Sequence, residues 1–161
     1  GGSGRSRKWG QSPLQIIMPQ GKIAVDSETF MITPECPVPD LVCLQWAYED
    51  EHTDMVRHDE ASEWLAIFLQ ECGEIIGHNI AYDMSVFAKH DTSLLRPIFQ
   101  AYSEGRIRDT QLRESLIRIE AGTFKDHRTG QRRPLSLDSI AQERLEMSLD
   151  KGDDGWRTRY G

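Results

Sequence analysis

Long apolar runs, secretion signals and paired cysteines are all missing from this sequence of 161 residues. No apolar run approaches the roughly 18 residues that a membrane-spanning helix needs, and no segment has the pattern of a signal peptide. The three cysteines form no Cys-x-x-Cys pair, which favours reduced thiols in a cytoplasmic protein. A zinc site made of Cys36, Cys43 and either His52 or His58 has no standard ligand spacing and is disfavoured.

An excess of positive charge is also missing, because the formal net charge is −7. That sign argues against a free-standing binder of duplex DNA, which needs Lys and Arg to displace counterions. It does not exclude an enzyme that holds a few nucleotides through bound metal ions. The hydrophobic content of 38% and the charged content of 28% are ordinary for one soluble globular domain, and no internal repeat is visible.

The order of predicted elements indicates an α/β fold. The opening stretch GGSGRSRKWG is typical of a flexible leader or a cloning remnant, so residues 1–20 are left out of the predicted domain. Strands come first as a meander and then alternate with helices, which favours a mixed β-sheet flanked by helices. The predicted strands are 22–28, 41–48, 54–58, 74–79 and 106–110, and the predicted helices are 61–72 (with Gly73 as C-cap), 81–90, 93–105, 111–122 and 135–145 (with Ser136 as N-cap).

Two carboxylates stand one residue apart at the end of the first predicted strand, in the stretch KIAVDSETF. Side chains alternate between the two faces of a strand, so Asp26 and Glu28 point to one face and Ser27 to the other. An isolated pair of this kind is also compatible with a solvated strand end that has no function.

A second polar group follows the apolar strand in the stretch IIGHNIAYDMSVF. Asp83 falls in the first turn of the next predicted helix and can face the end of the first strand. Three carboxylates without compensation repel one another. A pair of Mg²⁺ or Mn²⁺ ions resolves this, because hard oxygen ligands suit these cations and two such ions can clamp a phosphodiester.

These two stretches resemble the first two motifs of the DEDD-type 3′–5′ exonucleases, which have a ribonuclease-H-like fold. The stretches LVCLQWAY, RIRDTQL, LSLDSIAQERL and LDKGDDGWRTRYG extend the resemblance, over residues 21–161, to the exonuclease domain of phage-encoded family A DNA polymerases. The resemblance implies metal-dependent hydrolysis at the 3′ end of single-stranded DNA. It also implies a proofreading role beside a polymerase domain, in the cytoplasm of a bacterial or phage-infected cell.

The resemblance also implies a role for each residue of the two motifs. Asp26 would bridge two metal ions, Glu28 would support the ion that activates water, and Asp83 would hold the second ion. The residues expected to contact the terminal nucleotide are Thr29, Phe30, His78, Asn79 and Tyr82.

The third motif of the family, Tyr-x3-Asp or His-x4-Asp, supplies a fourth carboxylate that this sequence lacks. Only His78 and Asp83 have the spacing, and they lie inside the second motif. We therefore expect a C-terminally truncated domain whose activity is impaired. Two alternatives stay open: a non-catalytic module with this fold, and a nuclease of the same fold that acts on RNA. The oligomeric state is not predicted.

Other conspicuous residues have simpler interpretations. Asp109 is read as the N-cap of helix 111–122, and the basic loop 125–133 as a solvated charged loop. Trp46 and Trp64 are expected in the core, whereas Trp156 is left open. The stretch DKGDDG fails the calcium-loop pattern, because glycine occupies its third and twelfth positions.

Overall fold

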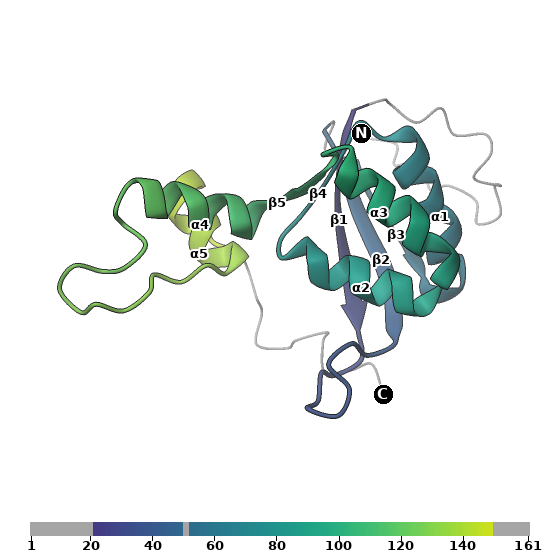
Figure 1. The fold of residues 1–161 in the computed structure, drawn as a ribbon, viewed down its shortest axis with the longest axis horizontal. Helices are drawn as coiled ribbons and strands as arrows, with labels where there is room; N and C mark the ends of the chain where they lie inside the picture. The colour runs from purple at the N-terminus through teal and green to yellow at the C-terminus, as the bar shows by residue number, and fades with distance from the viewer. Residues whose placement is uncertain (1–20, 50–51, 150–161) are drawn as a thin grey trace, which may run out of the picture.

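The computed structural model describes residues 21–49 and 52–149, which form a five-stranded mixed sheet with helices (Figure 1). The strand order is β3-β2-β1-β4-β5. Strand β2 runs antiparallel to β1 and β3, whereas β4 runs parallel to β1 and β5. The strands are β1 (Lys22–Thr29), β2 (Leu41–Tyr48), β3 (Thr53–Arg57), β4 (Glu74–Gly77) and β5 (Ile107–Asp109). The predicted α/β class with a mixed sheet is confirmed. The leader 1–20, the stretch DKGDDG and Trp156 lie outside the described residues.

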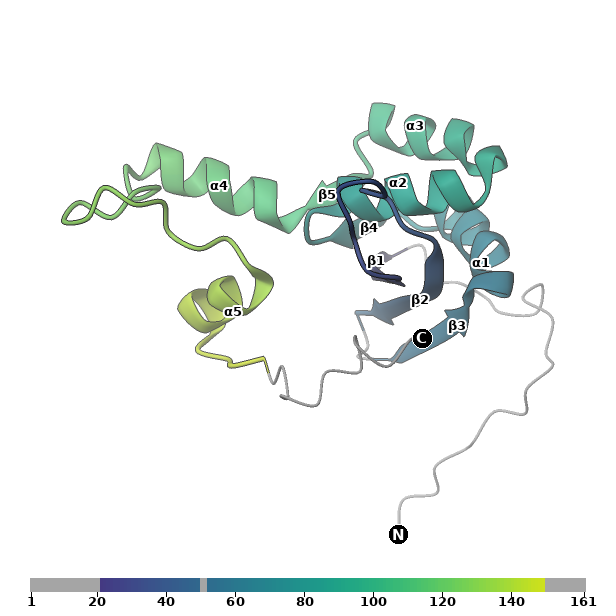
Figure 2. The ribbon, with the colours of Figure 1, turned by 90° about the horizontal axis from the view of Figure 1, so that it is seen from below.

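Helices cover one face of this sheet and leave much of the other face open (Figure 2). The covering elements are α1 (His58–Glu71), α2 (Ile80–His90), the short 3-10 helix η2 (Thr92–Leu94) and α3 (Leu95–Ser103). Helices α4 (Thr110–Glu120) and α5 (Leu137–Leu145) instead project sideways from the β5 edge (Figure 1). The open face therefore borders α5 without being buried by it.

The core lies between the sheet and the covering helices, where Ile23 and Val25 of β1 point. Trp46 of β2 stacks on Trp64 of α1 with ring centroids 4.9 Å apart, and Phe68 meets Trp46 edge to face at 5.3 Å. Both tryptophans are buried, which confirms the prediction that they belong to the core. Burial of such large aromatic side chains is a main source of stability in a domain of this size.

Some predicted boundaries differ from the structure. Helix α1 begins at His58, before the predicted start, because Asp59 and Glu60 in its first turn interact favourably with the helix dipole. Gly73 is not the C-cap, since Cys72 takes that position in an extended conformation. The helix expected from residue 93 begins as η2 and continues as α3, with Pro97 in the first turn, where a missing N–H is tolerated.

The two edges of the sheet are short or polar. Strand β5 has only three residues. Strand β3, at the opposite edge, has five residues and is mostly exposed. On β3 the side chain of Asp54 accepts a hydrogen bond from the backbone N–H of Met55 at 2.9 Å.

Helices α4 and α5 are joined by a buried cation. Arg118 of α4 is 2% exposed and donates to Glu114 and to Glu143, each at 2.7 Å. The remaining guanidinium nitrogen of Arg118, Nη1, donates to the carbonyl oxygen of Pro134 at 2.9 Å. Arg144 of α5 donates to Glu114, also at 2.9 Å. Ionic contacts thus hold this pair of helices where apolar packing is sparse.

Candidate functional site

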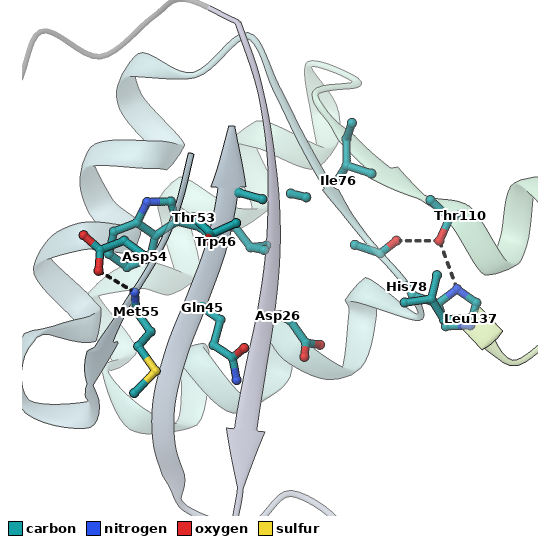
Figure 3. Close-up of a pocket in the computed structure, with 14 residues that line it drawn as sticks. Asp26, Gln45, Trp46, Thr53, Asp54, Met55, Ile76, His78, Thr110 and Leu137 are labelled. Carbon is teal, nitrogen blue, oxygen red and sulfur yellow. Dashed lines mark hydrogen bonds between the residues drawn. The ribbon is translucent and has the colours of Figure 1, made fainter. Parts of the chain in front are cut away.

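Strand β1 presents the two predicted acids away from the helices. Its residues alternate in burial, so Ser27 is buried under the helices while Asp26 on the other face is exposed. Glu28 is half-buried, and the register with β2 shifts between Glu28 and Thr29. Asp26 stands opposite Gln45 of β2, and both border a hollow on the open face (Figure 3).

Asp83 contacts β1 from the opposite side, at the residue between the two acids. One of its carboxylate oxygens accepts hydrogen bonds from the Ser27 N–H at 3.0 Å and from the Ser27 hydroxyl at 2.6 Å. Asp83 is only 4% exposed, and this burial raises its pKa to about 6. The negative charge of Asp26 contributes to the same rise, so the two carboxylates interact electrostatically.

The chemistry of these side chains fits a hard divalent cation. A buried carboxylate with a raised pKa beside a second carboxylate is a place where a cation would relieve both burial and repulsion. Within residues 21–49 and 52–149, however, no three Asp, Glu, His or Cys side chains are grouped closely enough to hold a metal ion. Convergence of Asp26, Glu28 and Asp83 on shared metal ions therefore stays a prediction.

Three of the residues expected to contact a nucleotide gather where β1 ends. The hydroxyl groups of Thr29 and Tyr82 are 3.1 Å apart, and Thr29 also donates to the carbonyl oxygen of Phe30 at 2.9 Å. Phe30 is 50% exposed, and the two residues after it, Met31 and Ile32, are exposed as well. This strand end thus combines polar groups fixed by a hydrogen bond with an accessible aromatic ring.

The other two expected residues, His78 and Asn79, lie beyond the end of β4. Asn79 is the N-cap residue of α2 in the left-handed conformation, with φ 59° and ψ 41°, and its side chain makes no capping bond. Its backbone N–H donates to Asp109 at 3.2 Å. The same Asp109 oxygen accepts from the N–H groups of Gln111 and Leu112, which confirms Asp109 as the N-cap of α4.

The ring of His78 is held by the first turn of α4. Its Nδ1 is 3.0 Å from the hydroxyl of Thr110, which donates to the carbonyl oxygen of Gly77 at 3.2 Å (Figure 3). Gln111 lies 3.4 Å from the other ring nitrogen. A hydroxyl that donates to a carbonyl can accept from Nδ1–H, so this chain of bonds favours a proton on Nδ1.

A hollow of about 550 Å³ lies on the open face beside these residues. Its walls come from β1, β2, β3 and β4, with Thr110 and Leu137 closing one side (Figure 3). Most of its lining surface is apolar, and the polar residues on it are Asp26, Gln45, Thr53, Asp54, His78 and Thr110. The site therefore sits between a buried acid on the helix side and an open, partly apolar surface on the other.

Sequence patterns missed two contributors to this region. Burial raises the pKa of Tyr102 on α3, and the negative charges of Asp109 and Asp83 raise it further. The bond from Asn79 to Asp109 was also missed. An asparagine after a glycine-containing strand end is a weak signal for the left-handed conformation, since Asn adopts it more readily than most residues.

Comparison with known proteins separates fold from activity. No protein-family model matches the chain, and no curated protein matches it. Solved structures do match. NrnC of Brucella melitensis with bound Mg²⁺ matches with a TM-score of 0.54 and 19% identity, over 82% of this chain and 57% of that one. The same protein bound to pGG matches with a TM-score of 0.55 and 19% identity, over 84% of this chain and 58% of that one. The EXO domain of Aedes aegypti Nibbler also matches, with a TM-score of 0.57 and 16% identity, over 87% of this chain and 66% of that one.

The fold is the ribonuclease-H-like exonuclease fold. The predicted fold class is thereby confirmed at the level of architecture. The chain spans less than two thirds of the length of these structures. At such low identity the likeness concerns the fold, and activity has to be argued from the site.

No helix among the described residues is long and apolar enough to cross a membrane. All three cysteines are free, as expected, with Cys43 and Cys72 buried. Burial raises the pKa of Cys72 to about 11, which disfavours its thiolate form at neutral pH.

Proposed function

We propose that this chain carries most of a metal-dependent 3′–5′ exonuclease site that removes nucleotides from single-stranded nucleic acid. The observation that supports it most directly is the placement of Asp83. It reaches β1 at Ser27, between Asp26 and Glu28, and it is buried with a raised pKa beside the charge of Asp26. A structural acid at a solvated strand end has no need of this arrangement.

In the proposed mechanism Asp26, Glu28 and Asp83 would hold Mg²⁺ or Mn²⁺. The bound ions would activate water and stabilise the charge that develops on the phosphate. Ser27 holds Asp83 in place, and the hydrogen-bonded hydroxyls of Thr29 and Tyr82 orient the terminal nucleotide. The exposed ring of Phe30 stacks on the last base, while Asn79 and His78 line the approach from β4. The product is a nucleoside 5′-monophosphate.

The fourth carboxylate belongs to this proposal as well. The family pattern places it in a motif after the WRTRYG-like segment, and residues 21–161 are proposed to be the part of the domain that precedes it. A site with one ligand missing binds its second ion weakly and hydrolyses slowly, because both ions must be held in register.

The wider setting is proposed from the sequence resemblance. DNA as substrate, proofreading beside a polymerase domain and a cytoplasmic location in a bacterial or phage-infected cell are supported by the stretches RIRDTQL, LSLDSIAQERL and LDKGDDGWRTRYG. A second candidate is cleavage of very short oligonucleotides. The structure of NrnC bound to pGG, which shares this fold, favours it.

The test compares this chain with a longer chain from the same parent that includes the following helix. Each is incubated with Mn²⁺ and 5′-labelled DNA or RNA, either single-stranded oligonucleotides or dinucleotides. We expect stepwise shortening from the 3′ end by the longer chain, a rate lower by orders of magnitude for the shorter one, and loss of activity in Asp83→Asn. If the longer chain leaves every substrate intact, the fold serves a non-catalytic module and the proposal fails.

A further inference from the structure

The loop between α4 and α5 is an ordered hairpin, which we call the basic hairpin and define as residues 124–133. The N–H of Arg133 donates to Phe124 at 3.1 Å, and the N–H of Asp126 donates to Gln131 at 2.8 Å. At the tip, the side chain of Asp126 accepts from the N–H groups of residues 128 and 129, each at 2.9 Å. Gly130 adopts φ +69° there, as a tight turn requires. The hairpin is therefore a formed surface.

Cations dominate this surface although the chain as a whole is acidic. The hairpin carries four cationic residues, Lys125, Arg128, Arg132 and Arg133, against the single acid Asp126. The carboxylate of Asp126 is used inside the turn, where the backbone N–H of Thr129 gives the largest lowering of its pKa. The net charge of the whole sequence is −7, so this concentration of positive charge stands out.

Three of these cations are available to a ligand. Lys125, Arg128 and Arg132 are exposed, and in the described part of the chain none forms an ion pair with a carboxylate. The guanidinium of Arg132 lies 5.4 Å above the ring of Phe124, which fixes its direction without neutralising it. Arg133 differs, since it lies 3.6 Å from Glu143.

The hairpin is held at a defined place relative to the candidate site. Helix α4 begins at Thr110, which contacts His78, and its 11 residues give it a length of about 16 Å. The basic hairpin follows at the far end of α4 (Figure 1). Buried Arg118 binds the carbonyl oxygen of Pro134, so the return strand of the hairpin is attached to α4. The cations thus lie about one helix length from His78.

We propose that the basic hairpin binds the phosphate backbone of a nucleic acid strand whose 3′ end lies at the candidate site, an inference that rests on the proposed function. Guanidinium groups suit phosphate oxygens because their planar donors match phosphate geometry. The helix-long separation means that the hairpin acts on strands of several nucleotides and leaves dinucleotides unaffected. From that spacing we expect the chain to bind longer single strands more tightly than short ones.

The experiment measures binding without catalysis. Fluorescence anisotropy of a labelled single strand is recorded in EDTA over a range of salt concentrations for wild type and for the double variant Arg128→Ala/Arg132→Ala. Each lost phosphate contact lowers the slope of log affinity against log salt by about 0.7, so the double variant should lose about 1.4. The double variant Arg128→Lys/Arg132→Lys should keep most of the slope.

The matched control is Arg57→Ala/Arg96→Ala, which removes the same charge from two exposed arginines on β3 and α3. An equal loss of slope in both double-alanine variants would mean that only net charge matters and would overturn the proposal. Tighter binding of polyglutamate than of the strand would overturn it too, in favour of an acidic protein partner. Dinucleotide cleavage by the longer chain, measured separately, tests the proposed function alone, and the hairpin variants should leave it unchanged.

Discussion

The hydroxyl of Ser27 donates to the carboxylate of Asp83 at 2.6 Å, across 56 positions of sequence. Both residues are buried, and the Ser27 N–H donates to the same oxygen. Both donors bind the same carboxylate oxygen of Asp83, Oδ1. The residue between the two acids of β1 is therefore the one that fixes the third acid.

Replacing Ser27 by alanine tests this contact. The backbone donor remains, but a hydrogen bond to a charged group is lost, so the free energy of unfolding at pH 8 should fall by about 1.5–3 kcal/mol. Ser27→Thr keeps the hydroxyl and should retain most of the stability. Urea denaturation measures both, with Ser85→Ala as control, because the Ser85 hydroxyl bonds only its own helix at an exposed position. Equal effects of both alanine variants would contradict the assigned role.

Asp83 gives a prediction about pH. Its pKa of about 6 in the folded chain lies above the ordinary aspartate value, so the folded state takes up the proton more readily than the unfolded state. Stability from this group is present at low pH and is lost as pH rises from about 4 to 6. Asp83→Asn should therefore be more stable than wild type at pH 8, by about 3 kcal/mol, with little difference near pH 4. Thermal melts of both proteins between pH 4 and pH 8 measure this. If the pKa of Asp83 were ordinary, the melting temperatures of wild type and Asp83→Asn would change with pH in parallel.

A bound divalent cation should offset the destabilisation that the buried, ionised Asp83 causes at pH 8. Mn²⁺ binding to the folded chain raises its stability by about 2.7 kcal/mol at a concentration one hundred times the dissociation constant. We expect a rise in melting temperature with Mn²⁺ at pH 8 and its near-complete loss in Asp26→Asn. Asp59→Asn, on the exposed first turn of α1, is the matched control and should keep the rise. An undiminished shift in Asp26→Asn would place the ions elsewhere.

The ion pairs that Glu114 forms with Arg118 and Arg144, where α4 meets α5, give a further prediction. Hydrogen bonds from Arg144 and then Arg118 hold the pKa of Glu114 below its ordinary value. Because the pKa of Glu114 is lower in the folded chain, its carboxylate stabilises the fold above pH 4.5. This stabilisation is lost in more acidic solution. Glu114→Gln should reduce the stability of this helix pair by about 3 kcal/mol at pH 7, because buried Arg118 loses a partner. Amide exchange in α4 and α5 should rise in the variant, whereas exchange in β1 and β2 should not.

Local patterns predicted the parts of the site that depend on a single element. Alternation along β1 predicts that Asp26 and Ser27 face opposite sides, and the structure confirms it. The position of Asp109 before a helix predicts an N-cap, which is also confirmed. Each needs only the geometry of one strand or one helix end.

Contacts between distant elements could not be predicted in this way. Ser27 holds Asp83 because a crossover brings α2 over β1, and no periodicity encodes which residue lies under the helix. The order in the basic hairpin depends on a turn around Asp126 and on Arg118 beneath it, so a charge run alone suggested only a solvated loop. Such features follow from tertiary packing, which overrides local preference.

Open sheet edges invite other chains to pair with them, and both edges here are poorly suited to that. Strand β5 offers only three residues, and on β3 the carboxylate of Asp54 already occupies the N–H of Met55. Short and charged edges of this kind oppose strand addition and the aggregation that follows from it. We therefore expect concentrated solutions of this chain to resist fibre formation, and any self-association to use helices or the open sheet face, without extending the sheet.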